Sequence, residues 1–419
     1  MGAKKRDGEM VSVADIVAAR KAGVGIIKHT PITESAALSD RFGFPIVFKA
    51  ESLQRTGSFK IRGAMNKLHR LLHVEKSDRV KNGVTAGSAG NHAQALAFAA
   101  KHFGVPCEIF VPTGASLSKM EACRGYGAQL IEGGDSLDDA IVAAQRRAEE
   151  ANMVFCHPFD DVDVIAGQGT LGLELLEDLA DVSLVLIPLG GGGLTSGTAI
   201  ALKTARPDIV VVGVQVASCA PYAGIPPGTG PIVTLADGIA VKQPGKITKP
   251  LIEQWVDRVV TVDEDSVADA MVFLMDRSKL YVEGGGAVGV SALLTGAVAP
   301  ATTGTTCVVL SGGNVDLGLV PNLIRRNETQ RGRRLIVFCR ISDRPGGLAR
   351  LLTIFAESGA NLIEVEHVRE GVDLHVRETG VQVVLEVRSS EHGDTVMAAA
   401  RHAGYELSPV QLTGIHGSH

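Results

Sequence analysis

Aromatic residues are scarce in this sequence, since Phe, Trp and Tyr together make up 4% of its 419 residues. Hydrophobic residues still reach 45%, so the core must be built mainly from Ala, Val, Leu and Ile. No apolar run approaches the roughly 20 residues that a membrane-spanning helix needs. We therefore expect a globular protein that does not cross a membrane.

Cysteine is also sparse. The six cysteines lie far apart, and no pair has the C-x-x-C or zinc-finger spacing. Scattered cysteines in a chain of this size are typical of reduced, buried thiols. The first residues lack the charged-then-apolar pattern of a secretory signal. The sequence thus predicts a cytoplasmic protein without a metal site.

An excess of positive charge is absent as well. The 41 Lys and Arg are outnumbered by 46 Asp and Glu, which gives a net charge of −5. Binding to nucleic acid requires a basic face. We therefore expect small-molecule ligands and no nucleic-acid partner.

Short apolar runs alternate with amphipathic stretches up to about residue 320. Alternation of this kind indicates strands and helices arranged around a buried parallel sheet. The expected strands are 46–48, 108–111, 182–188, 210–216 and 306–310. The clearest helical patterns are 93–103, 137–151 and 267–279.

The character of the chain changes after residue 321. Residues 322–334 are rich in Arg, Asn and Gln and poor in apolar periodicity, which is typical of a linker. Residues 335–412 then show the order strand, helix, strand, strand, helix, strand. This βαββαβ order over about 80 residues predicts a ferredoxin-like domain.

Lys60 lies in the segment Thr56–Ala64, between glycines and beside Phe59. A lysine amine must be neutral to attack a carbonyl, and burial beside Phe59 and Arg62 would lower its pKa. One hypothesis is therefore a covalent bond between Lys60 and an aldehyde. The alternative is an ordinary surface lysine at the start of a helix that Ser58 caps.

Two glycine-containing segments are expected to bind anions. Gly190–Gly193 directly follows the strand at 182–188, where backbone N–H groups can surround one phosphate. It fits neither G-x-G-x-x-G nor a P-loop. Ser88–His92 precedes a helix whose N-terminus could hold a carboxylate. The alternatives are a flexible loop and an ordinary serine-capped helix.

Ser311 opens the segment Ser311–Asn314 at the end of a buried strand. Ligands of open α/β sheets bind at the carboxyl ends of the strands. Ser311 could therefore offer a neutral hydroxyl to a ring nitrogen, although a turn serine would have the same surroundings.

Taken together, these four segments resemble the serine/threonine dehydratase family of fold-type-II pyridoxal-phosphate (PLP) enzymes, the tryptophan-synthase-β-like group. The resemblance covers about residues 25 to 320. It implies a PLP-dependent catalytic domain at 1–321 with two parallel-sheet subdomains, the smaller inserted at about 55–160.

The resemblance also implies residue roles. Lys60 is the catalytic lysine that bonds the cofactor. Cofactor contacts are expected from Phe59, Lys60, Asn91, Gly190, Gly191, Gly192, Gly193, Leu194, Glu283 and Ser311. The substrate carboxylate is expected at Ser88, Ala89, Gly90, Asn91 and His92.

The implied reaction is that of a threonine ammonia-lyase, which converts L-threonine to 2-oxobutanoate and ammonia in isoleucine biosynthesis or threonine catabolism. An L-serine or other hydroxyamino-acid dehydratase is the second hypothesis. An amino-acid sensor on an inactive PLP fold is the third, and an intact Lys60 speaks against it.

Two differences from serine racemases bear on the reaction and on metal binding. Serine racemases carry a second serine as proton donor where this chain has Ala89, which disfavours racemisation. Gln215 stands where racemases have an acidic metal ligand. No strong Mg²⁺ or Ca²⁺ site is therefore expected there.

The C-terminal domain resembles an ACT domain through Asp343–Leu348 and Asn361–Ile363. ACT domains bind small ligands between copies, so an amino-acid or nucleotide effector is expected at Gly346, Gly347 and Asn361. A dimerisation module without a ligand is the alternative. Either reading predicts a homodimer or homotetramer.

Overall fold

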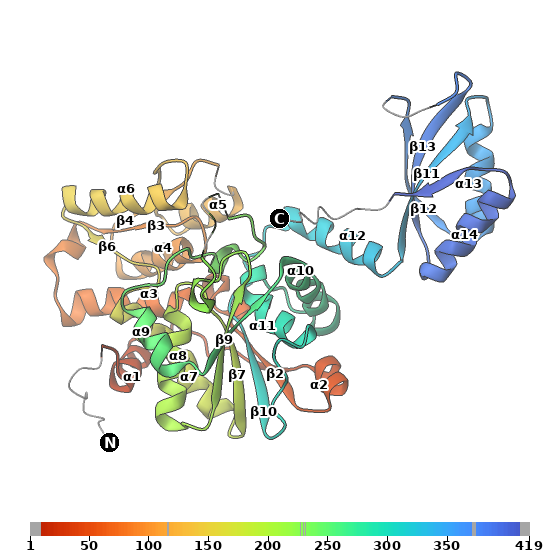
Figure 1. The fold of residues 1–419 in the computed structure, drawn as a ribbon. Coiled ribbons are helices and arrows are strands. Elements are labelled where there is room, and N and C mark those ends of the chain that lie inside the picture. Colours follow the sequence, from red (N-terminus) through yellow and green to blue (C-terminus); the bar gives the residue numbers. More distant parts are fainter. Residues whose placement is uncertain are drawn as a thin grey trace. The chain divides into compact units, whose positions relative to one another are not determined.

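A computed structural model describes residues 10–114, 117–226, 228, 230, 232–370 and 374–410. The chain divides into two compact units, Met1–Leu317 and Gly318–His419, and Figure 1 shows the elements of each. All four segments that the sequence singled out for chemistry belong to the first unit.

A six-stranded sheet forms the centre of the described part of the first unit, in the order β1-β2-β10-β7-β8-β9. The edge strand β1 runs antiparallel to β2, and the other neighbours are parallel. The strands are β1 (Ile32–Glu34), β2 (Ile46–Ala50), β7 (Val182–Pro188), β8 (Val210–Val216), β9 (Arg258–Val262) and β10 (Thr305–Leu310). The expected parallel sheet is confirmed.

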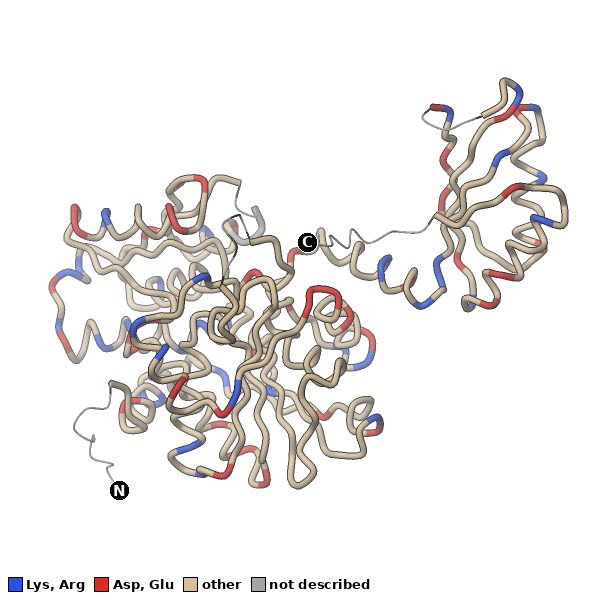
Figure 2. The backbone as a smooth tube through the Cα atoms, viewed as in Figure 1, with Lys and Arg blue, Asp and Glu red and all other residues tan. Residues whose placement is uncertain are grey.

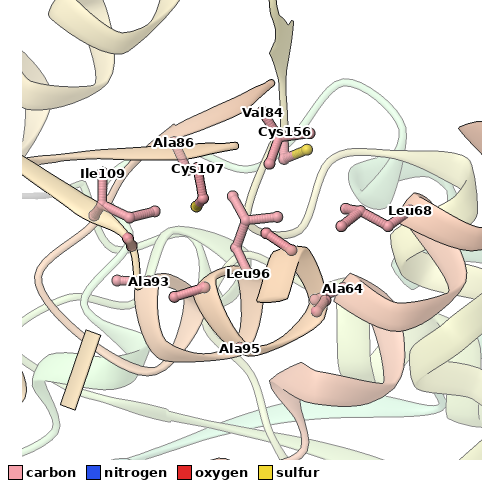
Figure 3. Close-up of a cluster of buried hydrophobic side chains, with 14 of the residues drawn as sticks. Ala64, Leu68, Val84, Ala86, Ala93, Ala95, Leu96, Cys107, Ile109 and Cys156 are labelled. Atoms are coloured by element: carbon pink, nitrogen blue, oxygen red, sulfur yellow. The ribbon is translucent and has the colours of Figure 1, made fainter. Parts of the chain in front are cut away.

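A second, parallel sheet of order β5-β4-β3-β6 is formed by the chain between β2 and β7. Its strands are β3 (Val84–Gly87), β4 (Cys107–Val111), β5 (Gln129–Glu132) and β6 (Val154–Phe155). Small side chains such as Ala93 and Ala95 pack between this sheet and two helices (Figure 3). A core so poor in aromatic residues allows helix and sheet to approach closely.

Helices cover both faces of the six-stranded sheet, with α7 and α8 on one side and α10 and α11 on the other (Figure 1). The described helices of the first unit are α1 (Val13–Ala22), α2 (Ala36–Phe42), α3 (Lys60–His69), α4 (Asn91–Phe103), α5 (Leu117–Gly125), α6 (Leu137–Glu150), α7 (Val162–Asp178), α8 (Gly193–Ala205), α9 (Thr248–Trp255), α10 (Glu264–Phe273) and α11 (Gly284–Leu294).

The second unit contains an antiparallel sheet of order β12-β13-β11-β14. Its strands are β11 (Arg334–Ser342), β12 (Asn361–Val368), β13 (Glu378–Glu386) and β14 (Leu407–Pro409), and its two packed helices are α13 (Gly347–Glu357) and α14 (Ser390–His402). The expected ferredoxin-like βαββαβ order is confirmed.

The segment expected to be a linker, 322–334, is mostly helical. Helix α12 (Val320–Gln330) occupies it, and the break between the units falls after Leu317. Leu323 and Asn327 are both buried and lie one helical turn apart. The sequence did not predict this helix because Asn327 is polar, so the two buried positions do not form an apolar pattern.

The cysteines agree with the expectation from their spacing, since all six are free and buried. Among the described residues, no helix is both long and apolar enough to span a bilayer. Lys and Arg are interspersed with Asp and Glu in both units (Figure 2).

Candidate active site

A pocket lies at the carboxyl ends of β7 and β10, where the six-stranded sheet meets the first residues of α3, α4, α8 and α11. Its lining residues are Phe59, Lys60, Asn91, Phe159, Pro188, Gly190, Gly191, Gly192, Gly193, Leu194, Thr195, Gly238, Ile239, Glu283 and Ser311. All the residues expected to contact the cofactor are therefore brought together from distant parts of the chain.

Lys60 is the first residue of α3, and its Nζ donates a hydrogen bond of 2.7 Å to the backbone carbonyl of Pro158. Nζ also lies 5.2 Å from the centre of the Phe59 ring. Desolvation lowers the pKa of Lys60 to about 8, against the opposing field of the Glu283 carboxylate. At pH 7 about a tenth of the amine is neutral, compared with roughly 0.03% for an ordinary lysine.

Arg62 does not contribute to this shift, although the sequence suggested that it would. Its guanidinium is buried between the carboxylates of Glu51 and Glu174, with distances of 2.6–3.0 Å to their oxygens. Two carboxylates thus neutralise the charge of Arg62 away from Lys60. Burial and the Glu283 carboxylate govern the Lys60 amine.

The loop before Lys60 is bound to the loop after β10. The N–H of Phe59 donates to the Ser311 carbonyl at 3.1 Å, and the N–H of Gly313 donates to the Gly57 carbonyl at 2.8 Å. Ser58 and Gly312 form a β-bridge between these contacts. Lys60 and Ser311 consequently enter the pocket from one jointly fixed piece of backbone.

The tetraglycine turn follows β7 and leads into α8. A Cβ at Gly191 would lie 2.2 Å from the Phe159 ring, and Gly192 has φ +92°, so neither position tolerates another residue without strain. The first N–H groups of a helix have no partner within the helix and favour an anion. The turn thus places the N-terminus of α8 at the pocket.

Asn91, the first residue of α4, also lines the pocket. Its Nδ2 donates to Oε1 of Glu283 at 2.7 Å. Glu283 immediately precedes α11 and is itself buried. This hydrogen bond connects the smaller sheet region to the larger one directly beside Lys60.

The expected substrate loop lies between β3 and α4, but only Asn91 of its residues lines the pocket. The Ser88 hydroxyl accepts from the N–H of Gly90 at 3.3 Å, and Ala89 lies between them. The His92 ring is buried against the Cys156 carbonyl at 2.9 Å, and burial lowers its pKa to about 3. The ring is thus neutral and hydrogen-bonded to the Cys156 carbonyl, so it offers no positive charge to a carboxylate.

Three pocket features had no signal in the sequence. Phe159 packs on the tetraglycine turn, and Gly238 and Ile239 line the pocket next to it. Asn314 belongs to a segment that the sequence singled out, but its role emerges only from its contacts with Thr56 and Asn91. Tertiary contacts over such separations leave no local pattern.

The expected effector residues lie in two places of the second unit. Gly346 has φ +86° and caps α13, and a Cβ at Gly347 would lie 2.3 Å from the Ser342 carbonyl oxygen. Asn361 begins β12, and its Nδ2 donates to Glu386 at 3.0 Å. Backbone geometry thus explains both glycines without a ligand.

The residues present fit a PLP group. A turn that only glycines can form brings a helix N-terminus to one end of the pocket, as a phosphate requires. A lysine amine of lowered pKa lies in the same pocket, as an aldehyde requires. The Ser311 side chain supplies a neutral hydroxyl.

Comparison with known proteins gives concordant matches. The family described as "Pyridoxal-phosphate dependent enzyme" matches residues 25–312. The L-threonine ammonia-lyase of Thermotoga maritima is 41% identical over 403 residues, which cover 95% of this chain and 99% of that protein.

Two solved structures are similar in fold. A threonine deaminase from T.th. superimposes with a TM-score of 0.66 at 37% identity, covering 73% of this chain and 99% of its own. Maize serine racemase gives a TM-score of 0.69 at 32% identity, covering 77% of this chain and 99% of its own.

Proposed function

The chain belongs to the family of pyridoxal-phosphate-dependent enzymes, and on that premise we propose that it is an L-threonine ammonia-lyase, which converts L-threonine to 2-oxobutanoate and ammonia. The observation that carries the proposal is the Lys60 amine, of lowered pKa, in one pocket with the tetraglycine turn. The fold is that of fold-type-II PLP enzymes.

When bound, PLP supplies an electron sink that stabilises negative charge at the α-carbon of the amino acid. The N-terminus of α8 would hold its phosphate, and Ser311, Asn91 and Phe59 would orient its ring. Ser311 would offer a neutral hydroxyl to the ring nitrogen, which leaves that nitrogen without a full positive charge. We propose that the uncharged ring nitrogen makes the cofactor a weaker electron sink, which favours β-elimination over transamination.

Lys60 Nζ is the base that removes the α-proton of threonine, because a tenth of the amine is already neutral at pH 7. Backbone N–H groups at the start of α4 orient the substrate carboxylate. The β-hydroxyl leaves with a proton as water. The released enamine becomes an imine, and a second water hydrolyses it to 2-oxobutanoate and ammonia.

Elimination is favoured over racemisation because Ala89 has no proton to donate. Racemisation needs a second acid on the face opposite Lys60, and a methyl side chain cannot serve. We therefore propose that the similarity to serine racemase lies in the fold and in cofactor binding. L-serine is expected as a poorer substrate, since it shares the β-hydroxyl.

The test is the release of 2-oxo acid from L-threonine, L-serine and threo-3-hydroxyaspartate by the PLP-loaded protein. Threonine is expected to give the highest kcat/KM. Lys60→Ala should remove turnover with all three substrates and the visible absorbance of the bound cofactor. Lys28→Ala is the matched control, because the Lys28 Nζ lies outside the pocket and donates to the exposed Leu53 carbonyl.

Other results would point elsewhere. Serine turned over faster than threonine would favour a serine dehydratase. A protein that binds PLP and threonine without releasing 2-oxo acid would favour the sensor hypothesis. Borohydride reduction that attaches the cofactor to a residue other than Lys60 would overturn the assignment of the site.

We further propose that the second unit is an ACT domain that couples an amino-acid or nucleotide effector to turnover. Its βαββαβ order and the loop at Gly346 and Gly347 support this. Pairing of such units would give a homodimer or homotetramer. The six free, buried cysteines support a place in the reducing cytoplasm.

A further inference from the structure

Asn314 connects three separate segments around the pocket. Its Nδ2 donates to the Thr56 carbonyl at 2.8 Å and to Oδ1 of Asn91 at 2.7 Å. Asn314 itself follows Ser311 in the loop after β10. One amide group therefore joins the loops that carry Lys60, Asn91 and Ser311.

The hydrogen bonds fix which way the Asn91 amide faces. An ionised carboxylate only accepts hydrogen bonds, so Glu283 requires the NH₂ end of Asn91, which lies 2.7 Å from its Oε1. The Asn91 oxygen must then face Asn314, whose NH₂ group donates to it. The Asn91 amide thus faces an acceptor at its nitrogen and a donor at its oxygen, and both hydrogen bonds would be lost if the amide were flipped.

The oriented Nδ2 of Asn91 carries two protons, and Glu283 accepts one of them. Asn91 lines the pocket, so its second proton remains for a ligand acceptor there. With Asn91 flipped, two oxygens would face each other at the Glu283 end. The orientation that Asn314 enforces is therefore the one that keeps a donor in the pocket.

Asn314 also holds the backbone ahead of Lys60. Thr56 has φ +61°, a left-handed conformation that is unfavourable for a β-branched residue. The Asn314 bond to the Thr56 carbonyl is one of the contacts that keep this turn closed. Gly57 has φ +72°, and a Cβ there would lie 2.3 Å from Asn314 Oδ1, so glycine is favoured at this position.

We propose that Asn314 is a positioning residue, which acts on the cofactor through Asn91 by fixing the orientation of the Asn91 amide. The inference rests on the proposed function only through the cofactor. It makes no assumption about the substrate, so PLP binding tests it without threonine.

The experiment is a double-mutant cycle of Asn314→Ala and Asn91→Ala, with the dissociation constant of PLP for the apoprotein and the absorbance spectrum of the bound cofactor as readouts. Losing one buried hydrogen bond typically changes affinity by about tenfold. Asn314→Ala is expected to weaken PLP binding by about that factor. In the Asn91→Ala background the same change should have a clearly smaller effect, because only the Asn314 bond to the Thr56 carbonyl is then lost.

Asn66→Ala is the matched control, because Asn66 is a buried asparagine that donates at 2.7 Å to the Asp163 backbone carbonyl. It should lower the melting temperature and leave the PLP affinity and spectrum unchanged. Asn314→Asp, which keeps the size but turns a carboxylate oxygen toward two acceptors, should weaken PLP binding at least as much as Asn314→Ala.

Three results would overturn the proposal. These are an unchanged PLP affinity in Asn314→Ala, an equal loss of affinity with and without Asn91, and full retention of affinity in Asn314→Asp. Absence of threonine turnover in the wild-type protein would instead refute the proposed function, and it would leave this cycle interpretable.

Discussion

At the scale of single residues, the Lys60 amine determines the pH dependence of cofactor attachment. Burial lowers its pKa to about 8, so the reactive neutral form rises about tenfold per pH unit below 8 and saturates above it. The rate of covalent PLP attachment to the apoprotein should follow this curve. An ordinary lysine would still gain rate up to about pH 10. Stopped-flow absorbance across this pH range measures the inflection.

A substitution at Glu283 tests the direction of the electrostatic effect on the pKa of Lys60. Its carboxylate raises the pKa of Lys60 against the effect of burial. Glu283→Gln should therefore move the inflection to lower pH, with more neutral amine at pH 7. A shift to higher pH in this variant would contradict the electrostatic account of the site.

Residue patterns predicted the chemical groups of the pocket better than their mutual contacts. Lys60, Asn91, Glu283, Ser311 and the glycine turn follow from local motifs and the family resemblance, and they meet in one pocket. The His92 ring and the Asn314 amide depend on partners 64 and 223 residues away in the sequence. A single sequence contains no sign of such pairs.

At the scale of elements, a buried charge cluster connects β2, α3 and α7. All five N–H donors of Arg62 are used, by Glu51, Glu174 and the Thr170 hydroxyl. Lys49 Nζ likewise contacts Glu174, Asp178 and the Thr30 carbonyl at 2.7–2.9 Å. Complete pairing of this kind makes each charge tolerable in the interior.

Arg62→Ala should therefore lower the free energy of unfolding by about 3–5 kcal/mol, because it removes the guanidinium from two buried carboxylates. Among the described residues, Glu51 then keeps only the Thr30 hydroxyl, and Glu174 keeps only Lys49. Urea denaturation of the apoprotein measures the loss. Arg20→Ala is the control, since the Arg20 pair with Glu177 is 40% and 50% exposed and should contribute only about 0–1 kcal/mol. Equal losses in the two variants would contradict the importance of burial.

The bounds of strands could be predicted from the sequence where nearly every residue of the strand is apolar and buried. Strands β7 and β8 begin and end at the predicted residues because they are apolar almost throughout. The short strands β1, β3, β5 and β6 and the edge strand β9 were missed, since segments as short as Val84–Gly87 give too little periodicity. Helix α12 was missed because its polar residues outnumber its buried positions.

At the scale of the whole molecule, the two units separate after Leu317 and each has its own core. The pocket residues all belong to the first unit. The threonine deaminase of similar fold spans only 73% of this chain, while 99% of its own length matches. A catalytic unit of this kind therefore exists without a matching C-terminal unit.

A chain ending at Leu317 should consequently bind PLP and turn over L-threonine with a kcat within about threefold of the full-length value, an allowance of about 0.7 kcal/mol. Titration of isoleucine, valine and AMP should change the threonine kinetics of the full-length protein only. The comparison is informative because the truncation removes the loop at Gly346 and the whole antiparallel sheet but no pocket residue. An effector response that survives truncation would place the regulatory site in the catalytic unit. A truncated protein that still binds PLP but has lost turnover would show that the second unit contributes to catalysis itself.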